Sequence, residues 1–216
     1  MRAVVFDMDG LMFDTERLAM AAWDYAGEKL GVGKAGYMVM KTLGVTAERA
    51  DEIWREEFGA DIDTEAMRRY GREFTGDFYE HNKVPVKPGL YELLDWLKSA
   101  RIKTAVASSS TRRAVDRNLK SAGITDKFNV TVCGEMAARS KPAPDIYLKA
   151  CELLGESPED CIALEDSRNG LWSAHNAGCR VIMVPDLWKA DEETEKILWK
   201  KLGSLLEVRN FLRGDE

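Results

Sequence analysis

The sequence has little cysteine and little histidine. Its 216 residues include two histidines and four cysteines, which are Cys133, Cys151, Cys161 and Cys179. The cysteines form no CxxC pair, so their spacing predicts neither a structural zinc site nor a disulfide framework. We expect them to act as small buried hydrophobic residues. Neither His81 nor His175 adjoins a strand-to-helix nucleophile turn, which disfavours a histidine-based catalytic triad.

The chain also lacks long apolar runs. No stretch approaches the roughly 18–20 residues of a membrane span, and residues 1–2 lead into a predicted strand rather than into a signal-peptide core. We therefore expect a cytoplasmic protein with no membrane partner. The net charge of −6 disfavours nucleic acid as a partner, although an acidic average is compatible with a local basic site. We also expect a monomer.

Apolar periodicity divides the chain into two kinds of region. Residues 15–83 show only helical patterns, whereas from residue 84 onward short strand patterns alternate with helical ones. The later strands are expected at residues 102–107, 129–133, 161–164 and 180–184. Alternating strands and helices predict an α/β fold with a doubly wound parallel sheet, which is a Rossmann-like core.

The first predicted strand, residues 3–6, must join this sheet although the helical stretch separates it from the other strands. The sequence therefore predicts a catalytic core made of residues 1–14 and 84–216. Residues 15–83 are predicted to form an inserted all-helical cap domain. With 45% hydrophobic residues, a chain of this length can bury one good core and a small satellite domain.

Two acidic residues follow the first predicted strand. The apolar run at residues 3–6 is typical of a strand buried on both faces, and it ends at Asp7-Met8-Asp9-Gly10. If the strand extends into Asp7, its period of two places Asp7 and Asp9 on the same side, with Gly10 in the turn. Such carboxylates repel each other unless a cation lies between them or one is protonated. The pair suits metal-assisted catalysis by a nucleophile and an acid/base, although a simple Asp-rich turn is the plainer alternative.

Polar side chains also follow three of the later strands. In a doubly wound sheet, the carboxyl ends of the strands open on one crevice. The residues expected there are Ser108, Ser109 and Ser110, then Lys141, then Glu165 and Asp166. Hydroxyls and backbone N–H groups at a helix N-terminus suit an anion, and we expect Pro142 to begin the helix beside Lys141. Each group alone could be a helix cap or a surface charge. Together they indicate a site for a divalent cation and a phosphate.

The residue types divide the work of such a site among them. Asp7, Asp9 and Asp166 are hard oxygen donors that suit Mg²⁺, and Glu165 would bind the ion directly or stand just behind the ligands. Lys141 and Ser108 would offset the remaining phosphate charge. A unit charge ~4 Å away contributes about 4 kcal/mol at an effective dielectric constant of 20, so losing the lysine could slow the reaction by several powers of ten. Asp7 is then the expected nucleophile and Asp9 the acid/base.

Four segments, DMDGLMFDTE, VASSS, KPAPDIY and EDSRNG, resemble in this order the signature motifs of the haloacid dehalogenase-like hydrolases. The resemblance is to the branch of phosphatases and β-phosphoglucomutases that has a helical cap. It implies an aspartyl-phosphate on Asp7, with Asp9 as acid/base. It also implies that Ser108 and Lys141 hold the phosphoryl group. The implied ligands of Mg²⁺ are Asp7, the Asp9 carbonyl, Glu165 and Asp166.

A loop of the predicted cap, Leu43-Gly44-Val45-Thr46, resembles the specificity loop of that family. The resemblance implies that Gly44 and Val45 contact the substrate, together with the serines of VASSS. The expected substrate is therefore a small phosphorylated metabolite, namely a sugar, polyol or nucleotide monophosphate. The sequence leaves its identity open.

The reaction type has three readings. We expect a Mg²⁺-dependent phosphatase, because Ala19 and Ala47 occupy the positions where mutases of the family have a His and an Arg that protect the aspartyl-phosphate. A phosphohexomutase similar to β-phosphoglucomutase is the second reading. A regulator that only binds a phosphorylated metabolite is the third, disfavoured because no motif carboxylate is missing. A dehalogenase is disfavoured because its chemistry has no use for a metal site.

Overall fold

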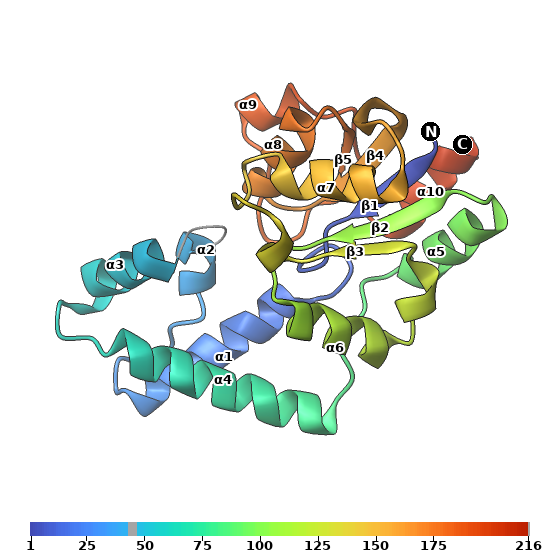
Figure 1. The fold of residues 1–216 in the computed structure, drawn as a ribbon. Helices are drawn as coiled ribbons and strands as arrows, with labels where there is room; N and C mark the ends of the chain where they lie inside the picture. Colours follow the sequence, from blue (N-terminus) through green and yellow to red (C-terminus); the bar gives the residue numbers. More distant parts are fainter. Residues whose placement is uncertain (43–46, 216) are drawn as a thin grey trace. The chain divides into compact units, whose positions relative to one another are not determined.

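The structure, a computed structural model, describes residues 1–42 and 47–215. The chain falls into two compact units, one formed by Met1–Phe13 with Pro85–Glu216 and the other by Asp14–Val84. The first is called the core unit below and the second the cap unit (Figure 1). No helix in the described part of the chain combines the length and the hydropathy that a membrane crossing requires.

The core unit is built on a parallel sheet of six strands in the order β3-β2-β1-β4-β5-β6. The strands are β1 (Ala3–Phe6), β2 (Lys103–Ala107), β3 (Val130–Val132), β4 (Cys161–Glu165), β5 (Arg180–Met183) and β6 (Lys200–Lys201). Figure 1 shows α7 and α8 over one face of this sheet and α5, α6 and α10 over the other. This arrangement confirms the predicted doubly wound α/β fold.

The helices of the core unit are α5 (Leu90–Ser99), α6 (Arg112–Ala122), α7 (Asp145–Leu154), α8 (Arg168–Asn176), α9 (Glu192–Glu195) and α10 (Leu205–Arg213). Several begin at a hydroxyl side chain. Thr111 accepts a hydrogen bond from the Ala114 N–H, and Ser167 accepts one from the Gly170 N–H. These N-caps satisfy backbone donors that would otherwise have no partner within the helix.

Helix α7 begins three residues later than expected. It starts at Asp145, after a turn in which the Ala143 N–H donates to the Ser140 carbonyl at 3.0 Å. The prediction that Pro142 is the first helical residue was therefore wrong. Ala143 precedes Pro144, and the ring of a proline disfavours the helical conformation for the residue before it.

Strand β1 lies in the middle of the hydrophobic core. Its four residues are fully buried, and it pairs in register with β2 on one side and β4 on the other. Val5, for example, lies between Ala105 and Ala163. A strand with neighbours on both edges and helices on both faces needs an apolar side chain at every position, as the sequence pattern indicated.

The cap unit contains α1 (Thr15–Lys29), α2 (Met38–Thr42), α3 (Ala47–Phe58) and α4 (Thr64–His81). Every regular element that the structure describes there is a helix. Its core is a cluster around Trp54, whose ring meets that of Trp23 edge-on at 5.3 Å and stacks on Phe58 at 5.5 Å. Gly71 allows close packing of α4 on α1, because a Cβ atom at this position would lie 3.1 Å from the Trp23 ring.

The four cysteines are all free and buried, as the sequence indicated. Burial raises the pKa of Cys133. A hydrogen bond with Cys161 lowers the pKa of Cys151, but the thiol of Cys179 at 3.9 Å and burial together raise it to about 12. Because the thiolate is the reactive form, these thiols should be inert in the folded protein.

We expect none of the four thiols to react with Ellman's reagent at pH 8 while the protein is folded, and all four to react in guanidinium chloride. The absorbance of the released thionitrobenzoate measures both counts. Rapid modification of any thiol in the folded protein would contradict the burial described here.

Candidate active site

The catalytic residues predicted from three separate motifs follow neighbouring strands. Asp7 follows β1, Ser108 follows β2, and Glu165 ends β4 with Asp166 directly after it. The ladder continues one residue beyond two of these strands, because the Asp7 N–H donates to Leu164 and the Ser108 N–H donates to Val132. Since β1 lies between β2 and β4, these side chains leave the sheet at one edge.

Lys141 joins two of these carboxylates. Its Nζ lies 2.5 Å from Oδ1 of Asp7 and 2.6 Å from Oε1 of Glu165. The side chains of Lys141, Asp7 and Glu165 are only 8%, 11% and 0% exposed, so little water screens their charges. The loop after β3 thus delivers its lysine to the ends of β1 and β4, as predicted from KPAPDIY.

The three charges depend on one another. Burial raises the pKa of Asp7 well above its ordinary value, and the Lys141 ammonium opposes that rise. Burial also lowers the pKa of Lys141, but the carboxylates of Asp7 and Glu165 outweigh it, so the pKa of this lysine is raised. The lysine therefore stays protonated and offsets part of the negative charge of the two carboxylates.

Glu165 accepts hydrogen bonds at both of its oxygens. Oε1 accepts from Lys141 and from the Tyr147 hydroxyl at 2.8 Å. Oε2 accepts from the backbone N–H groups of Asp166 and Ser167, at 3.1 and 3.3 Å, and from the Ser167 hydroxyl at 3.1 Å. Five donors exceed the roughly four lone-pair positions of a carboxylate. Glu165 is therefore the fixed anion that anchors Lys141 at the end of β4.

Three carboxylates could hold a metal ion. Asp7, Glu165 and Asp166 are all buried, and each offers an oxygen within 4.8 Å of those of the other two. Grouped carboxylate oxygens suit a hard divalent cation, and such an ion would relieve their mutual repulsion. The oxygens of Asp7 and Asp166 therefore fit the metal that the sequence predicts, and Glu165, whose oxygens already accept hydrogen bonds, fits the place just behind the ligands. The placement of a carbonyl ligand at Asp9 stays a prediction.

Gly10 allows Asp166 to approach the turn after β1. Its φ is +85°, and a Cβ atom at this position would overlap the Asp166 carboxylate. A tight turn also forms here, because the Gly10 N–H donates to Phe13 and the Met12 N–H donates to Met8, both at 2.9 Å. Glycine meets both requirements, the left-handed backbone and the close contact.

Two of the three serines after β2 contact Asp9. The Ser110 hydroxyl donates to Oδ2 of Asp9 at 2.7 Å, and the Ser108 hydroxyl lies 3.5 Å from the same oxygen. Ser108 is buried, and its Oγ accepts from the Ser110 N–H at 3.0 Å. Ser109 is exposed, and its carbonyl is closely approached by Gly134. The structure thus brings Ser108 and Ser110 to the acid/base candidate but not the side chain of Ser109.

The predicted contacts of Gly44 and Val45 with substrate lie outside the described residues. The structure also shows three residues beside the site to which the sequence assigned no role, although Ser167 was expected at the end of the same strand as Glu165. These are Tyr147, Ser167 and Gly170. The hydroxyls of Tyr147 and Ser167 donate hydrogen bonds to the carboxylate of Glu165. Gly170 lies so close to this carboxylate that a Cβ atom at its position would overlap it. Each lies inside one of the four motifs, so the sequence could place it near the site. The sequence could not show that it contacts Glu165.

A cavity of about 220 Å³ lies in the cap unit between α1 and α4. The residues lining it are Ala19, Ala22, Trp23, Arg68, Gly71, Arg72 and Thr75. The resemblance implies that Ala19 takes the position at which mutases of the family have a histidine. The small residues Ala19 and Gly71 therefore leave space in the cavity that Arg68 and Arg72 also line.

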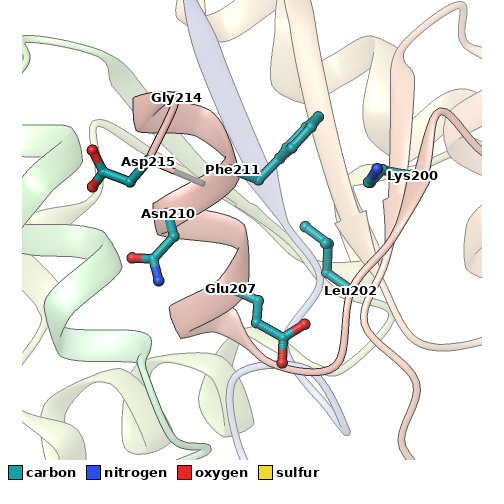
Figure 2. Close-up of a pocket in the computed structure, with 7 residues that line it drawn as sticks. All are labelled: Lys200, Leu202, Glu207, Asn210, Phe211, Gly214 and Asp215. Carbon is teal, nitrogen blue, oxygen red and sulfur yellow. The ribbon is translucent and has the colours of Figure 1, made fainter.

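A larger cavity, of about 590 Å³, lies between β6 and α10 of the core unit (Figure 2). The residues lining it are Lys200, Leu202, Glu207, Asn210, Phe211, Gly214 and Asp215. None of the predicted site residues is among them, and β4 and β5 separate β6 from β1 in the sheet. The carboxylates of the candidate site therefore belong to a different part of the core unit from this cavity.

Comparison with known proteins agrees with the motifs and the fold. Residues 1–178 match the model of the family described as haloacid dehalogenase-like hydrolase. The chain belongs to this family. A phosphorylated carbohydrates phosphatase of Thermotoga maritima is 32% identical over 178 residues, 82% of each protein. A β-phosphoglucomutase of Bacillus subtilis is 32% identical over 190 residues, 85% of this chain and 83% of that protein.

Among solved structures, CbbY from Rhodobacter sphaeroides in complex with phosphate is similar to this chain along nearly its whole length. The TM-score is 0.78, the sequences are 30% identical, and the alignment covers 96% of each chain. The family assignment made from four motifs is thereby confirmed.

We expect Gly10→Ala to weaken the binding of divalent cations at least tenfold, because the added methyl group would displace Asp166. Calorimetric titration with Mg²⁺ measures this affinity. Gly123→Ala is the matched control: it also has a positive φ, +68°, but open space where its Cβ atom would lie. Gly123→Ala should bind the cation like the wild type, and wild-type affinity in Gly10→Ala would show that the contact with Asp166 is unimportant.

Proposed function

We propose that this protein is a Mg²⁺-dependent phosphatase that hydrolyses small phosphorylated metabolites through an aspartyl-phosphate on Asp7. The observation that supports it best is the buried group in which Lys141 contacts Asp7 at 2.5 Å and Glu165 at 2.6 Å beside Asp166. A cation next to a buried carboxylate, with further carboxylates suited to Mg²⁺, is what transfer of a phosphoryl group to an aspartate needs.

We assign the roles of the residues from the sequence motifs, and their contacts support the assignment. An oxygen of Asp7 attacks phosphorus while the bond to the substrate alcohol breaks, and Asp9 gives a proton to the departing oxygen. Asp9 then accepts a proton from the water that attacks the aspartyl-phosphate, which releases inorganic phosphate and restores Asp7. Lys141 and Ser108 stabilise the negative charge of the phosphoryl oxygens during both steps. When bound, Mg²⁺ would supply positive charge that draws the phosphate toward Asp7.

The substrate class is a sugar, polyol or nucleotide monophosphate. The relatives named above include a phosphatase of phosphorylated carbohydrates, which supports a sugar phosphate among these. The same relatives include a phosphomutase, so an isomerase of this kind is the second candidate. Hydrolysis is favoured because Ala19 has neither the charge nor the hydrogen-bonding groups that would keep water from an aspartyl-phosphate.

We expect Asp7→Asn to lower the rate of p-nitrophenyl phosphate hydrolysis at least 10³-fold, because an amide oxygen is a poor nucleophile. The absorbance of p-nitrophenolate measures the rate. Asp160→Asn, which removes a carboxylate paired with Arg2 at 3.5 Å on the surface of the core unit, should retain the wild-type rate. Full Mg²⁺-dependent activity of Asp7→Asn would remove this residue from its proposed role.

We expect EDTA to abolish hydrolysis and Mg²⁺ to restore it. Asp166→Asn should need at least tenfold more Mg²⁺ for half-maximal activity, since it loses a charged oxygen donor. A titration of the initial rate against free Mg²⁺ gives the concentration for half-maximal activity of the wild type and of the variant. Undiminished turnover in EDTA after exhaustive dialysis would contradict the proposed metal dependence.

A screen of sugar, polyol and nucleotide monophosphates separates the two reactions. For a phosphatase, we expect stoichiometric release of inorganic phosphate and no isomer of the substrate. Malachite green detects the phosphate, and ³¹P NMR detects an isomer. Net formation of an isomer that depends on added sugar bisphosphate, without phosphate release, would favour the mutase instead.

A further inference from the structure

Tyr147 contacts both members of the Lys141–Glu165 ion pair. This tyrosine lies in the first turn of α7 and is fully buried. Its hydroxyl donates to Oε1 of Glu165 at 2.8 Å, and its ring centroid lies 5.1 Å from Nζ of Lys141. One side chain therefore stabilises the anion with a hydrogen bond and the cation with its aromatic face.

The hydroxyl competes with the lysine for a single oxygen. Within residues 1–42 and 47–215, Oε1 of Glu165 accepts two hydrogen bonds, one from Tyr147 and one from Lys141. Without the hydroxyl, the charge on Oε1 would be compensated by the ammonium alone. Lys141 would then be held more tightly by Glu165 and would interact less strongly with Asp7 and with a phosphoryl group there.

We propose that Tyr147 is a positioning residue, whose hydroxyl shares Glu165 with Lys141 and so keeps the ammonium available to Asp7 and to the phosphoryl group. The inference rests on the proposed function, in which Lys141 stabilises charge on the phosphoryl oxygens. Tyr147 does not touch the reacting atoms and acts only through Lys141 and Glu165. It is therefore distinct from the catalytic residues named above.

The ring and the hydroxyl can be tested separately. Tyr147→Phe keeps the aromatic face below Lys141 and loses only the hydrogen bond, whereas Tyr147→Leu loses both. Tyr25→Phe is a matched control, because the Tyr25 hydroxyl also donates to a carboxylate, that of Glu73 at 2.7 Å, but at an exposed position in the cap unit. Thermal melting of each variant reports whether the fold is retained.

We expect Tyr147→Phe to lower kcat for p-nitrophenyl phosphate by about 10- to 100-fold, the range for losing a hydrogen bond to a charged group. KM should change less than threefold, because the strongest demand on Lys141 comes in the transition state. Inhibition by vanadate, which mimics five-coordinate phosphorus, should weaken in parallel with kcat. Tyr147→Leu should lower kcat several-fold further than Tyr147→Phe does. Tyr25→Phe should have the kcat of the wild type.

A merely structural role for Tyr147 would give a different pattern. Tyr147→Phe would then lower the melting temperature, while kcat and the vanadate inhibition constant of the folded protein stayed within twofold of the wild type. That result would overturn the inference. An equal loss of kcat in Tyr25→Phe would overturn it as well, since the effect would not depend on Glu165.

Calorimetry with vanadate and Mg²⁺ keeps this test separate from the proposed function. If the wild-type protein hydrolyses no phosphate ester, the proposed function fails, but its affinity for vanadate can still be compared with that of Tyr147→Phe. A tenfold weaker affinity in the variant supports the positioning role. Equal affinities, or no binding to the wild type, overturn it.

Discussion

The site depends on a protonated lysine held between two buried carboxylates. Burying a single charge costs free energy of desolvation. Here the attraction between Lys141 and the carboxylates of Asp7 and Glu165, which are buried together, offsets that cost. The arrangement has one excess negative charge, which Asp166 increases. A divalent cation would offset this excess. The excess of negative charge among these carboxylates therefore supports the proposed metal site.

The sheet keeps these charges in place. β1 is fully buried between β2 and β4, so the position of Asp7 follows from a strand that cannot shift without exposing apolar side chains. Glu165 is supported from the next strand as well, because the Val184 N–H donates to its carbonyl at 2.8 Å. This support comes from beyond residue 178, where the match to the family model ends. The C-terminal segment thus contributes to the site without containing a signature motif.

Much of this architecture could be predicted from local patterns. The continuous apolar run of β1, the alternation of strands and helices after residue 84, and the purely helical pattern of residues 15–83 all follow from side-chain periodicity. Strand β6 was missed because its two residues, Lys200 and Lys201, are polar and exposed, and its pairing with β5 leaves no apolar signal. The expectations of a monomer and of a cytoplasmic location stay predictions.

By itself, the sequence determined the family, the α/β fold and the residues that deliver charge to the strand ends, because each of these is written in a short contiguous segment. Only the tertiary structure decided which side chains contact one another. Lys141 meets a carboxylate 134 residues away, and Tyr147 in helix α7 meets Glu165 at the end of strand β4. Ser109 is exposed, whereas Ser108 is buried. Such contacts depend on strand order and helix packing, and periodicity along the chain has no information about either.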